Sequence, residues 1–453
     1  MRAAFAAAPV PILLTTLYFT FSRGSWIALG IGLVVALTLD PHRVRLTATA
    51  LTVGVPAGLG VLAASRSVPL THLQSTVARA AHDGHRLALL LLAFVVACAA
   101  LTAALVLLRS VMSIPPVVSR SYPIALLAAA AVAVAVVLVY VGGPSAAARR
   151  AWDSFAAAPP KTQLDLRKRL FSFSGTGRAD LFRAAWYDAQ GHLIVGSGAG
   201  SYEAYWLSHR TVATKVRDAH SLYLETLAEG GIVGLALLLL ALGTPLVAAA
   251  RARKRRGVAA ATGAYVAYLA GAAVDWDWEI TSVTLAAIFV GVALLASARS
   301  DDERETSPVL RYSALGVALA IGVVGFVFLV GNMFLSRAST AAADAKWATA
   351  ARDAHRASSW LPWSTQPWEQ LGEAELAQGH VASAQASFRT AIEKDDGDWN
   401  LWLDLARAST GKPQLAALAH ATKLNPLSPE IAAFRSDLGS QLGISITASG
   451  AKP

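Results

Sequence analysis

Three polar segments of this 453-residue sequence contain arginine, glycine and histidine in patterns that suit the binding of an anion and the transfer of a proton. The first is Ser22-Arg23-Gly24, which separates two apolar runs. An arginine between apolar runs is costly unless it faces a cavity or an anion. The alternative is that the guanidinium only reaches out to lipid headgroups. The residues alone fit both interpretations equally well.

The second segment combines an arginine with many glycines. Gly177-Arg178 is followed by a Gly-x-Gly-x-Gly run at Gly196, Gly198 and Gly200. Glycines this dense allow backbone N–H groups to approach an anion closely. Their spacing is not that of a dinucleotide-binding fingerprint. The segment therefore predicts either an anion-binding loop or a network of tight turns.

The third segment places His220 five residues before Glu225, at the start of a long apolar run. Histidine is the usual proton acceptor near neutral pH, although a single histidine at a membrane interface is more often inert. His82 and His85 are three residues apart, but no third ligand follows at a useful spacing. The segment therefore predicts either acid–base chemistry or an inert interfacial histidine, and the histidine spacing predicts no metal site.

The elements that position these segments are apolar. The chain is 55% hydrophobic and only 15% charged, whereas a soluble protein carries about a quarter charged residues. Its apolar runs are long enough to cross a bilayer of about 30 Å. We expect an all-α polytopic bundle of about nine transmembrane helices, at residues 5–21, 24–39, 46–64, 87–108, 122–141, 222–250, 258–274, 280–298 and 312–331.

The basic residues predict a cell-membrane topology. The net charge of +10 lies largely in short loops, where it sets orientation rather than binding nucleic acid. The densest basic cluster, at residues 251–256, is placed in the cytoplasm. Alternation then puts other basic positions on the same side: Arg2, Arg43, Arg45, Arg109, Arg120, Arg304 and Arg311. We therefore predict four parts: helices at 1–141, an extracytoplasmic loop at 142–219, helices at 220–332, and an extracytoplasmic helical domain at 333–453.

The tail after residue 333 shows a repeat pattern. Its large and small residues are spaced as in a tetratricopeptide unit, in which two antiparallel helices interlock. They are Trp368, Leu371, Gly372, Gly379, Ala384, Phe388 and Ala391. A plain helical hairpin domain is the alternative, and either would offer a scaffold for a protein or glycan partner. Trp360 and Trp363 flank Pro362 and lie either at the membrane surface or against sugars.

Taken in order, the three segments resemble the O-antigen ligase family, also called Wzy_C-type membrane glycosyltransferases. That family has a Ser-Arg-Gly-aromatic motif, then a large loop with Gly-Arg, Trp and Gly-x-Gly-x-Gly, then a histidine before a helix with a Glu-Gly-x-x-Gly-Leu end. The resemblance covers roughly residues 10–245. The matching positions are Ser22-Arg23-Gly24, Gly177-Arg178, Trp186, Gly196, Gly198, Gly200, His220, Glu229, Gly231, Gly234 and Leu235.

The resemblance implies transfer of a preassembled glycan from an undecaprenyl-pyrophosphate carrier to a hydroxyl of a glycan, lipid or protein acceptor. The reaction takes place outside the cytoplasm, without metal or cofactor, in polysaccharide biosynthesis at the cell envelope. The resemblance makes Arg23, Arg178 and His220 catalytic. Arg210 and Arg217 are substrate-binding candidates by position, together with the three glycines at 196, 198 and 200. Ligation and polymerisation both remain open.

Two departures from the family pattern keep other hypotheses open. The family has several more helices before its Ser-Arg-Gly motif, so we expect either a truncated chain or a partner that supplies them. Ser221 and His192 stand where Asn and Pro are frequent. The alternatives are a polytopic transporter and a membrane-anchored scaffold without catalysis. The acidic stretch at 275–279 either anchors the membrane interface through its tryptophans or contacts the acceptor sugar.

Overall fold

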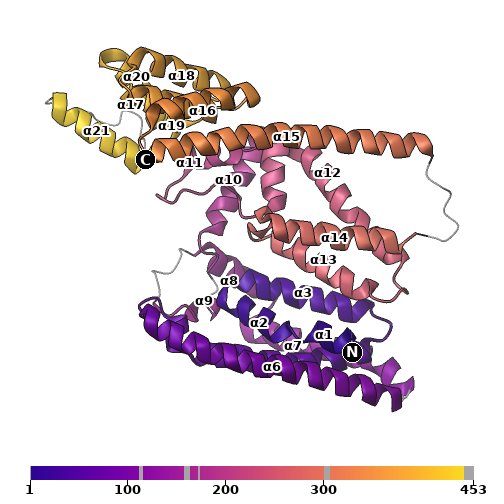
Figure 1. Cartoon of the computed structure of the whole chain (residues 1–453). Coiled ribbons are helices and arrows are strands. Elements are labelled where there is room, and N and C mark those ends of the chain that lie inside the picture. The colour runs from indigo at the N-terminus through magenta and orange to yellow at the C-terminus, as the bar shows by residue number, and fades with distance from the viewer. Residues whose placement is uncertain (1, 112–115, 158–163, 172–173, 300–306, 443–453) are drawn as a thin grey trace. The chain divides into compact units, whose positions relative to one another are not determined.

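The computed structural model describes residues 2–111, 116–157, 164–171, 174–299 and 307–442 (Figure 1). This part of the chain is α-helical, with one 3-10 helix, η1 (Asp277–Glu279), and no β-strand. A single isolated bridge joins His72 and Asp165. The predicted all-α fold is therefore confirmed. The chain divides into two compact units, Met1–Ala199 with Asp218–Ser300, and Gly200–Arg217 with Asp301–Pro453.

Apolar helices dominate the described residues. Four of them are long and apolar enough to cross a membrane: α4 (Arg43–Arg66), α6 (Val77–Val111), α12 (Leu222–Arg251) and α15 (Pro308–Ala343). Shorter apolar helices are α1 (Arg2–Ala7), α2 (Val10–Phe19), α3 (Arg23–Leu39), α13 (Val258–Ala272) and α14 (Thr281–Ser297). The predicted run at 122–141 lies in α7 (Pro116–Val141). The chain is a multi-pass membrane protein, while the count of nine spans, the orientation and the four-part division stay predictions.

A close crossing of two helices builds the centre of the first unit. Gly32 of α3 and Gly263 of α13 face each other, and a Cβ at Gly32 would lie 2.5 Å from the Gly263 carbonyl oxygen. Small residues let helix backbones approach in this way inside membranes. The crossing aligns the two helices so that Arg23, at the start of α3, lies near Asp275, just beyond the end of α13.

The segment after α7 also packs against the membrane helices. It contains α8 (Pro144–Ala156), α9 (Lys168–Phe171) and α10 (Arg178–Gly191), while α5 (Val68–Thr71) precedes α6. Leu166 and Leu170 pack against a buried cluster that includes Tyr18 and Phe21. Arg167 donates a hydrogen bond to the Ser65 carbonyl at 3.1 Å. The loop is therefore fixed to the bundle within α9 and just before it.

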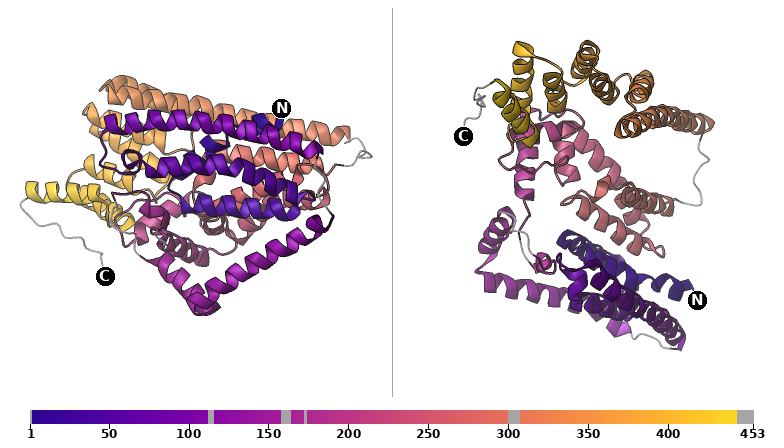
Figure 2. Two further views of the ribbon diagram at one scale, coloured as in Figure 1. Left: turned by 90° about the horizontal axis from the view of Figure 1, so that it is seen from below. Right: turned by 60° about the vertical axis from the view of Figure 1, so that its left-hand side comes forward.

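The second unit is built from successive packed helices after α15 (Figure 2). These are α16 (Trp347–Trp360), α17 (Gln366–Ala377), α18 (Val381–Lys394), α19 (Trp399–Arg407), α20 (Gly411–Leu424) and α21 (Pro429–Leu442). Phe388 of α18 is fully buried and fills the space that Gly372 of α17 leaves, where a Cβ would lie 2.7 Å from its ring. Large and small residues interlock here as the sequence pattern predicts, and the tetratricopeptide assignment itself stays a prediction.

Candidate active site

Arg23 begins a helix whose start is fixed by its neighbours. The Oγ of Ser22 accepts a hydrogen bond from the Ser25 N–H at 3.2 Å, which caps α3 so that the helix begins at Arg23. The two N-terminal apolar runs thus meet at this position as predicted. The Arg23 guanidinium donates to the carbonyl of Ser174, which lies 151 residues later in the chain. This bond ties the start of α3 to the loop that carries Arg178.

Arg178 is the first residue of α10, after Gly177 at φ +91°. Its Nη2 forms an ion pair with Asp275 Oδ2 at 2.7 Å, and the two side chains are only 23% and 11% exposed. The Arg178 Nε is buried and makes no hydrogen bond within the described part of the chain. The carboxylate therefore holds the guanidinium through Nη2, while the Nε N–H makes no hydrogen bond within the described residues.

Arg23 and Arg178 line the same cavity, which has a volume of about 630 Å³. The rest of its wall is mostly apolar and includes Tyr18, Trp26, Ile27, Val61, Phe155, Leu170 and Val274. Arg178 is close enough for its positive charge to act on Arg23. Two repelling guanidinium groups in an apolar wall suit a ligand with an anionic group and a greasy chain.

His220 is held in an unusual backbone conformation by two acidic residues. Its φ is +55°, a left-handed value that non-glycine residues adopt rarely. The Asp218 carboxylate accepts from the His220 N–H at 2.9 Å and lies 2.7 Å from its Nδ1. The buried Glu225 accepts from the Ala219 N–H at 2.8 Å. These contacts direct Nδ1 of His220 toward Asp218, so Nε2 is the ring nitrogen that could contact a substrate.

The charges around His220 include those of the arginine site. Burial lowers the pKa of His220, but hydrogen bonds and charge from Asp218 outweigh burial, so the pKa lies above its ordinary value. The positive charge of Arg178 acts in the opposite direction. Burial, followed by the charge of Asp275, raises the pKa of Asp277, while Arg178 and His220 lower it. Arg178 and His220 thus share one electrostatic environment, although His220 is not among the residues that line the cavity.

The glycines at 196 and 198 serve a close backbone crossing. The N–H of Gly196 donates to His192 at 2.8 Å, that of Ser197 to Ala228 at 2.9 Å, and that of Gly198 to Glu229 at 3.0 Å. A Cβ at Gly196 would collide with the backbone at 229–230. Of the two interpretations given by the sequence, these contacts match the network of tight turns. A role in substrate binding for Gly196 and Gly198 stays a proposal.

Comparison with known families bears on the segment that holds these residues. Residues 84–239 match the family model described as O-Antigen ligase. The chain contains an O-antigen ligase domain. The match includes Arg178, the glycine segment and His220, whereas Arg23 lies before it. Neither a curated protein nor a solved structure matches the chain. This family implies glycan transfer in a membrane by a glycosyltransferase-like enzyme.

The other predicted binding residues of the O-antigen ligase segment lie in the second compact unit. Gly200 precedes α11 (Ser201–His209), and Arg210 follows it. Arg210 is 5% exposed, and its guanidinium donates to the Asn425 side chain at 2.8 Å. Arg217 is 86% exposed and lies 3.7 Å from the Glu203 carboxylate. Arg210 is thus engaged with α20's C-terminal end, and a substrate role for Gly200, Arg210 and Arg217 stays a proposal.

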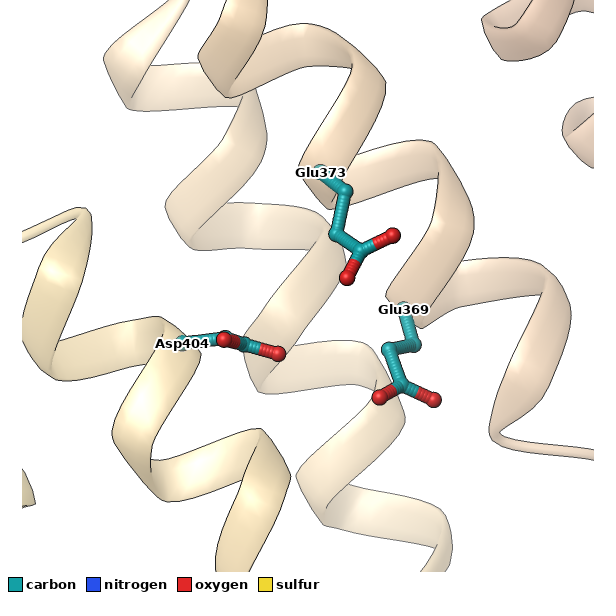
Figure 3. Close-up of side chains that lie close together, drawn as sticks. All are labelled: Glu369, Glu373 and Asp404. Atoms are coloured by element: carbon teal, nitrogen blue, oxygen red, sulfur yellow. The ribbon is translucent and has the colours of Figure 1, made fainter. Parts of the chain in front are cut away.

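Three carboxylates gather in the tail, outside the O-antigen ligase match (Figure 3). One oxygen each from Glu369, Glu373 and Asp404 lie within 4.8 Å of one another. Asp404 is already paired with Arg407 at 2.8 Å. Such a cluster is not a metal site on its own, because acidic groups gather on helical surfaces without an ion.

Sequence reasoning missed two contacts at the candidate site. Asp275 stands in an acidic, tryptophan-rich stretch that suggested membrane anchoring or sugar contact, yet it pairs with Arg178, 97 residues away. Asp218 lies two residues before His220 in the sequence. Its contact with the imidazole ring is seen only in the structure, where His220 has a φ of +55°. A signal for Asp275 existed in the cost of placing a carboxylate beside apolar helices without a cationic partner.

Proposed function

We propose that the O-antigen ligase domain transfers a glycan from a polyprenyl-pyrophosphate carrier, of the undecaprenyl type, to an acceptor hydroxyl. The observation that carries this proposal is the cavity shared by Arg23 and Arg178. A polyprenyl pyrophosphate joins a doubly charged anionic group to a long apolar chain. The two arginines suit the pyrophosphate, and the apolar wall suits the first isoprene units.

The proposed reaction breaks the bond between the anomeric carbon and the pyrophosphate oxygen. The bond electrons leave with the pyrophosphate, whose negative charge grows in the transition state. Arg23 and Arg178 stabilise that charge, because fixed cationic donors in a poorly hydrated site act more strongly than in water. Asp275 holds Arg178 so that its free N–H groups need little reorganisation.

The acceptor hydroxyl supplies the new bond to the anomeric carbon and must lose its proton. His220 is the proposed base, acting through Nε2, while Asp218 orients the ring through Nδ1. Asp277, with its raised pKa, is a further group near this environment. No step in this scheme requires a metal or cofactor.

The acceptor and the side of the membrane belong to the proposal. We place the loop at 142–219 and the tail outside the cytoplasm, where lipid-linked glycans are used. The acceptor is a glycan, a lipid or a protein, and its identity separates a ligase from a polymerase. The helical tail is the proposed contact for a protein partner.

The test is transfer by the purified chain in proteoliposomes that contain a polyprenyl-pyrophosphate-linked oligosaccharide. We expect Arg23→Ala, Arg178→Ala and His220→Ala each to lower the transfer rate by about 10²–10³-fold. Arg389→Ala is the matched control, because its side chain is exposed, belongs to the other unit and has no proposed role in the reaction. Undiminished transfer in the three variants would overturn the mechanism, whereas equal loss in the control would show a general effect on folding.

A further inference from the structure

Two exposed tryptophans in the second unit have a defined position along α15. Trp360 ends α16 and Trp363 follows it in the turn to α17, and they are 37% and 54% exposed. The Trp360 ring lies 6.3 Å from that of Phe326, and the Trp363 ring lies 5.5 Å from that of Phe328. Both phenylalanines belong to the apolar part of α15 and are themselves largely exposed.

The apolar part of α15 defines where the turn at residues 360–366 lies along the axis of that helix. It ends at Gly331, and a rise of 1.5 Å per residue puts Phe328 about 6 Å before Asn332 along the helix axis. Because α16 runs back along α15, it carries the turn to that level. Leu361 packs where Gly331 has no side chain, and it is 3% exposed. The turn is therefore held firmly beside the last residues of a candidate membrane span.

Basic side chains follow at the next level outward. The guanidinium groups of Arg337 and Arg356 lie 5.7 Å and 5.9 Å from the centre of the Phe334 ring. Lys394 lies at the level of the turn itself, where its Nζ donates to the Pro362 carbonyl at 2.5 Å. Moving along α15 out of its apolar part, the order is apolar, aromatic and then basic. This order is typical of a membrane–water interface, where aromatic rings lie at headgroup level and cations reach phosphates.

We infer that the turn at residues 360–366 is seated in the headgroup region of the bilayer leaflet where α15 ends, with Trp360 and Trp363 as its anchors. The occupant of this surface is phospholipid. A sugar is disfavoured because the rings lie beside exposed phenylalanines of a membrane helix, where hydroxyl groups would lose water. The tail is thereby fixed to the membrane at a second place besides α15, whichever side of the membrane it occupies.

The first test measures depth in the full-length chain. The chain is reconstituted in vesicles of phosphatidylethanolamine and phosphatidylglycerol, with Cys98→Ala as background. Nitroxide labels are attached at Ser364→Cys in the turn and at Val381→Cys. Val381 is exposed and begins α18, at the end of that helix opposite to Lys394, which contacts the turn. We expect the label at 364 to collide mainly with oxygen and the label at 381 mainly with a water-soluble nickel chelate. Equal exposure of both labels to the chelate would overturn the inference.

A second test needs no added cysteine. Lipids brominated near the headgroup quench tryptophan fluorescence by contact. We expect Trp363→Phe to reduce the fluorescence intensity that the lipid quenches, while Trp402→Phe, which removes an indole that stacks on His420 within the tail, leaves that quenched intensity unchanged. An unchanged quenched intensity in Trp363→Phe would overturn the inference, as would protection of Trp363 from oxidation by a soluble oligosaccharide instead of lipid.

Discussion

Asp275 holds the guanidinium of Arg178 in an ion pair of 2.7 Å, in which both side chains are mostly buried. A carboxylate beside a proposed anion site lowers the affinity for the anion, so its presence needs a structural reason. The pair fixes a flexible side chain at the start of α10, where nothing else described bonds its Nε. We therefore expect position, rather than net charge, to be the main contribution of Arg178 to the proposed site.

Arg178→Lys tests this conclusion. A lysine keeps the charge, but its compact ammonium cannot bond Asp275 along one edge and a phosphate along another. We expect the transfer rate to fall by roughly 10²-fold, with protein yield unchanged. The measurement is single-turnover transfer from a polyprenyl-pyrophosphate-linked glycan. A lysine variant as active as the parent would show that charge alone suffices.

The pH dependence of transfer should report His220. A base must be neutral, so the rate should rise with pH as His220 loses its proton, at a pKa above the ordinary 6.5. Asp218→Asn removes the charge that raises this pKa, and the rising limb should then move to lower pH. The pH–rate profiles of the parent and of Asp218→Asn check both points. An identical limb in the two proteins would exclude His220 as the group that titrates.

Arg210 and Arg217 provide a matched pair for the second unit. Arg210→Ala leaves the buried Asn425 amide without its partner, and we expect a loss of about 1–3 kcal/mol in the free energy of unfolding of that unit. Arg217→Ala removes an exposed, long-range pair and should change little. Limited proteolysis between residues 200 and 217 would show faster cleavage for Arg210→Ala alone.

The tail should lose stability as the pH rises. Burial raises the pKa of Glu369 from 4.5 to about 7, and the charges of Asp398, Asp404 and Glu373 add to the effect. Between about pH 4.5 and about pH 7, the folded state binds more protons than the unfolded state, so the free energy of unfolding falls with increasing pH. Glu369→Gln should flatten the curve between pH 5 and pH 8 and raise Tm at pH 8. The check is thermal unfolding of the tail, expressed as residues 340–442.

Cysteine labelling tests the predicted orientation. In a Cys98→Ala background, Val381→Cys should react with an impermeant maleimide added to intact cells. Lys254→Cys, in the basic segment after α12, should react only after the membrane is opened. The reverse pattern would invert the whole topology, because every loop follows by alternation.

The helices were predictable from sequence because apolar runs are local signals. Most predicted runs lie on one helix, but the run at 5–21 is divided between α1 and α2, and α12 is kinked at Gly231. The two N-terminal runs meet at Ser22, which caps α3. The pairing of Arg178 with Asp275 was not predictable, because it joins positions 97 residues apart through the crossing at Gly32 and Gly263. Gly196 suggested an anion loop or a tight turn, and in the structure it leaves room for the backbone at 229–230, while Gly231 leaves room for the backbone at 194–196. From one sequence, a glycine can be recognised as a position where another group comes close. The segment that comes close cannot be identified without the structure.

The second unit has a consequence for biosynthesis, since it joins chain segments made at different times. Arg210 bonds Asn425, which is synthesised 215 residues later. At 5–20 residues per second, the interval is roughly 10–45 s. During that time α12 and the helices after it enter the membrane, while the segment around α11 has no final partner. The loop therefore reaches its mature form only after the C-terminal helices have been made, which leaves an interval in which chaperones or proteases can act on it.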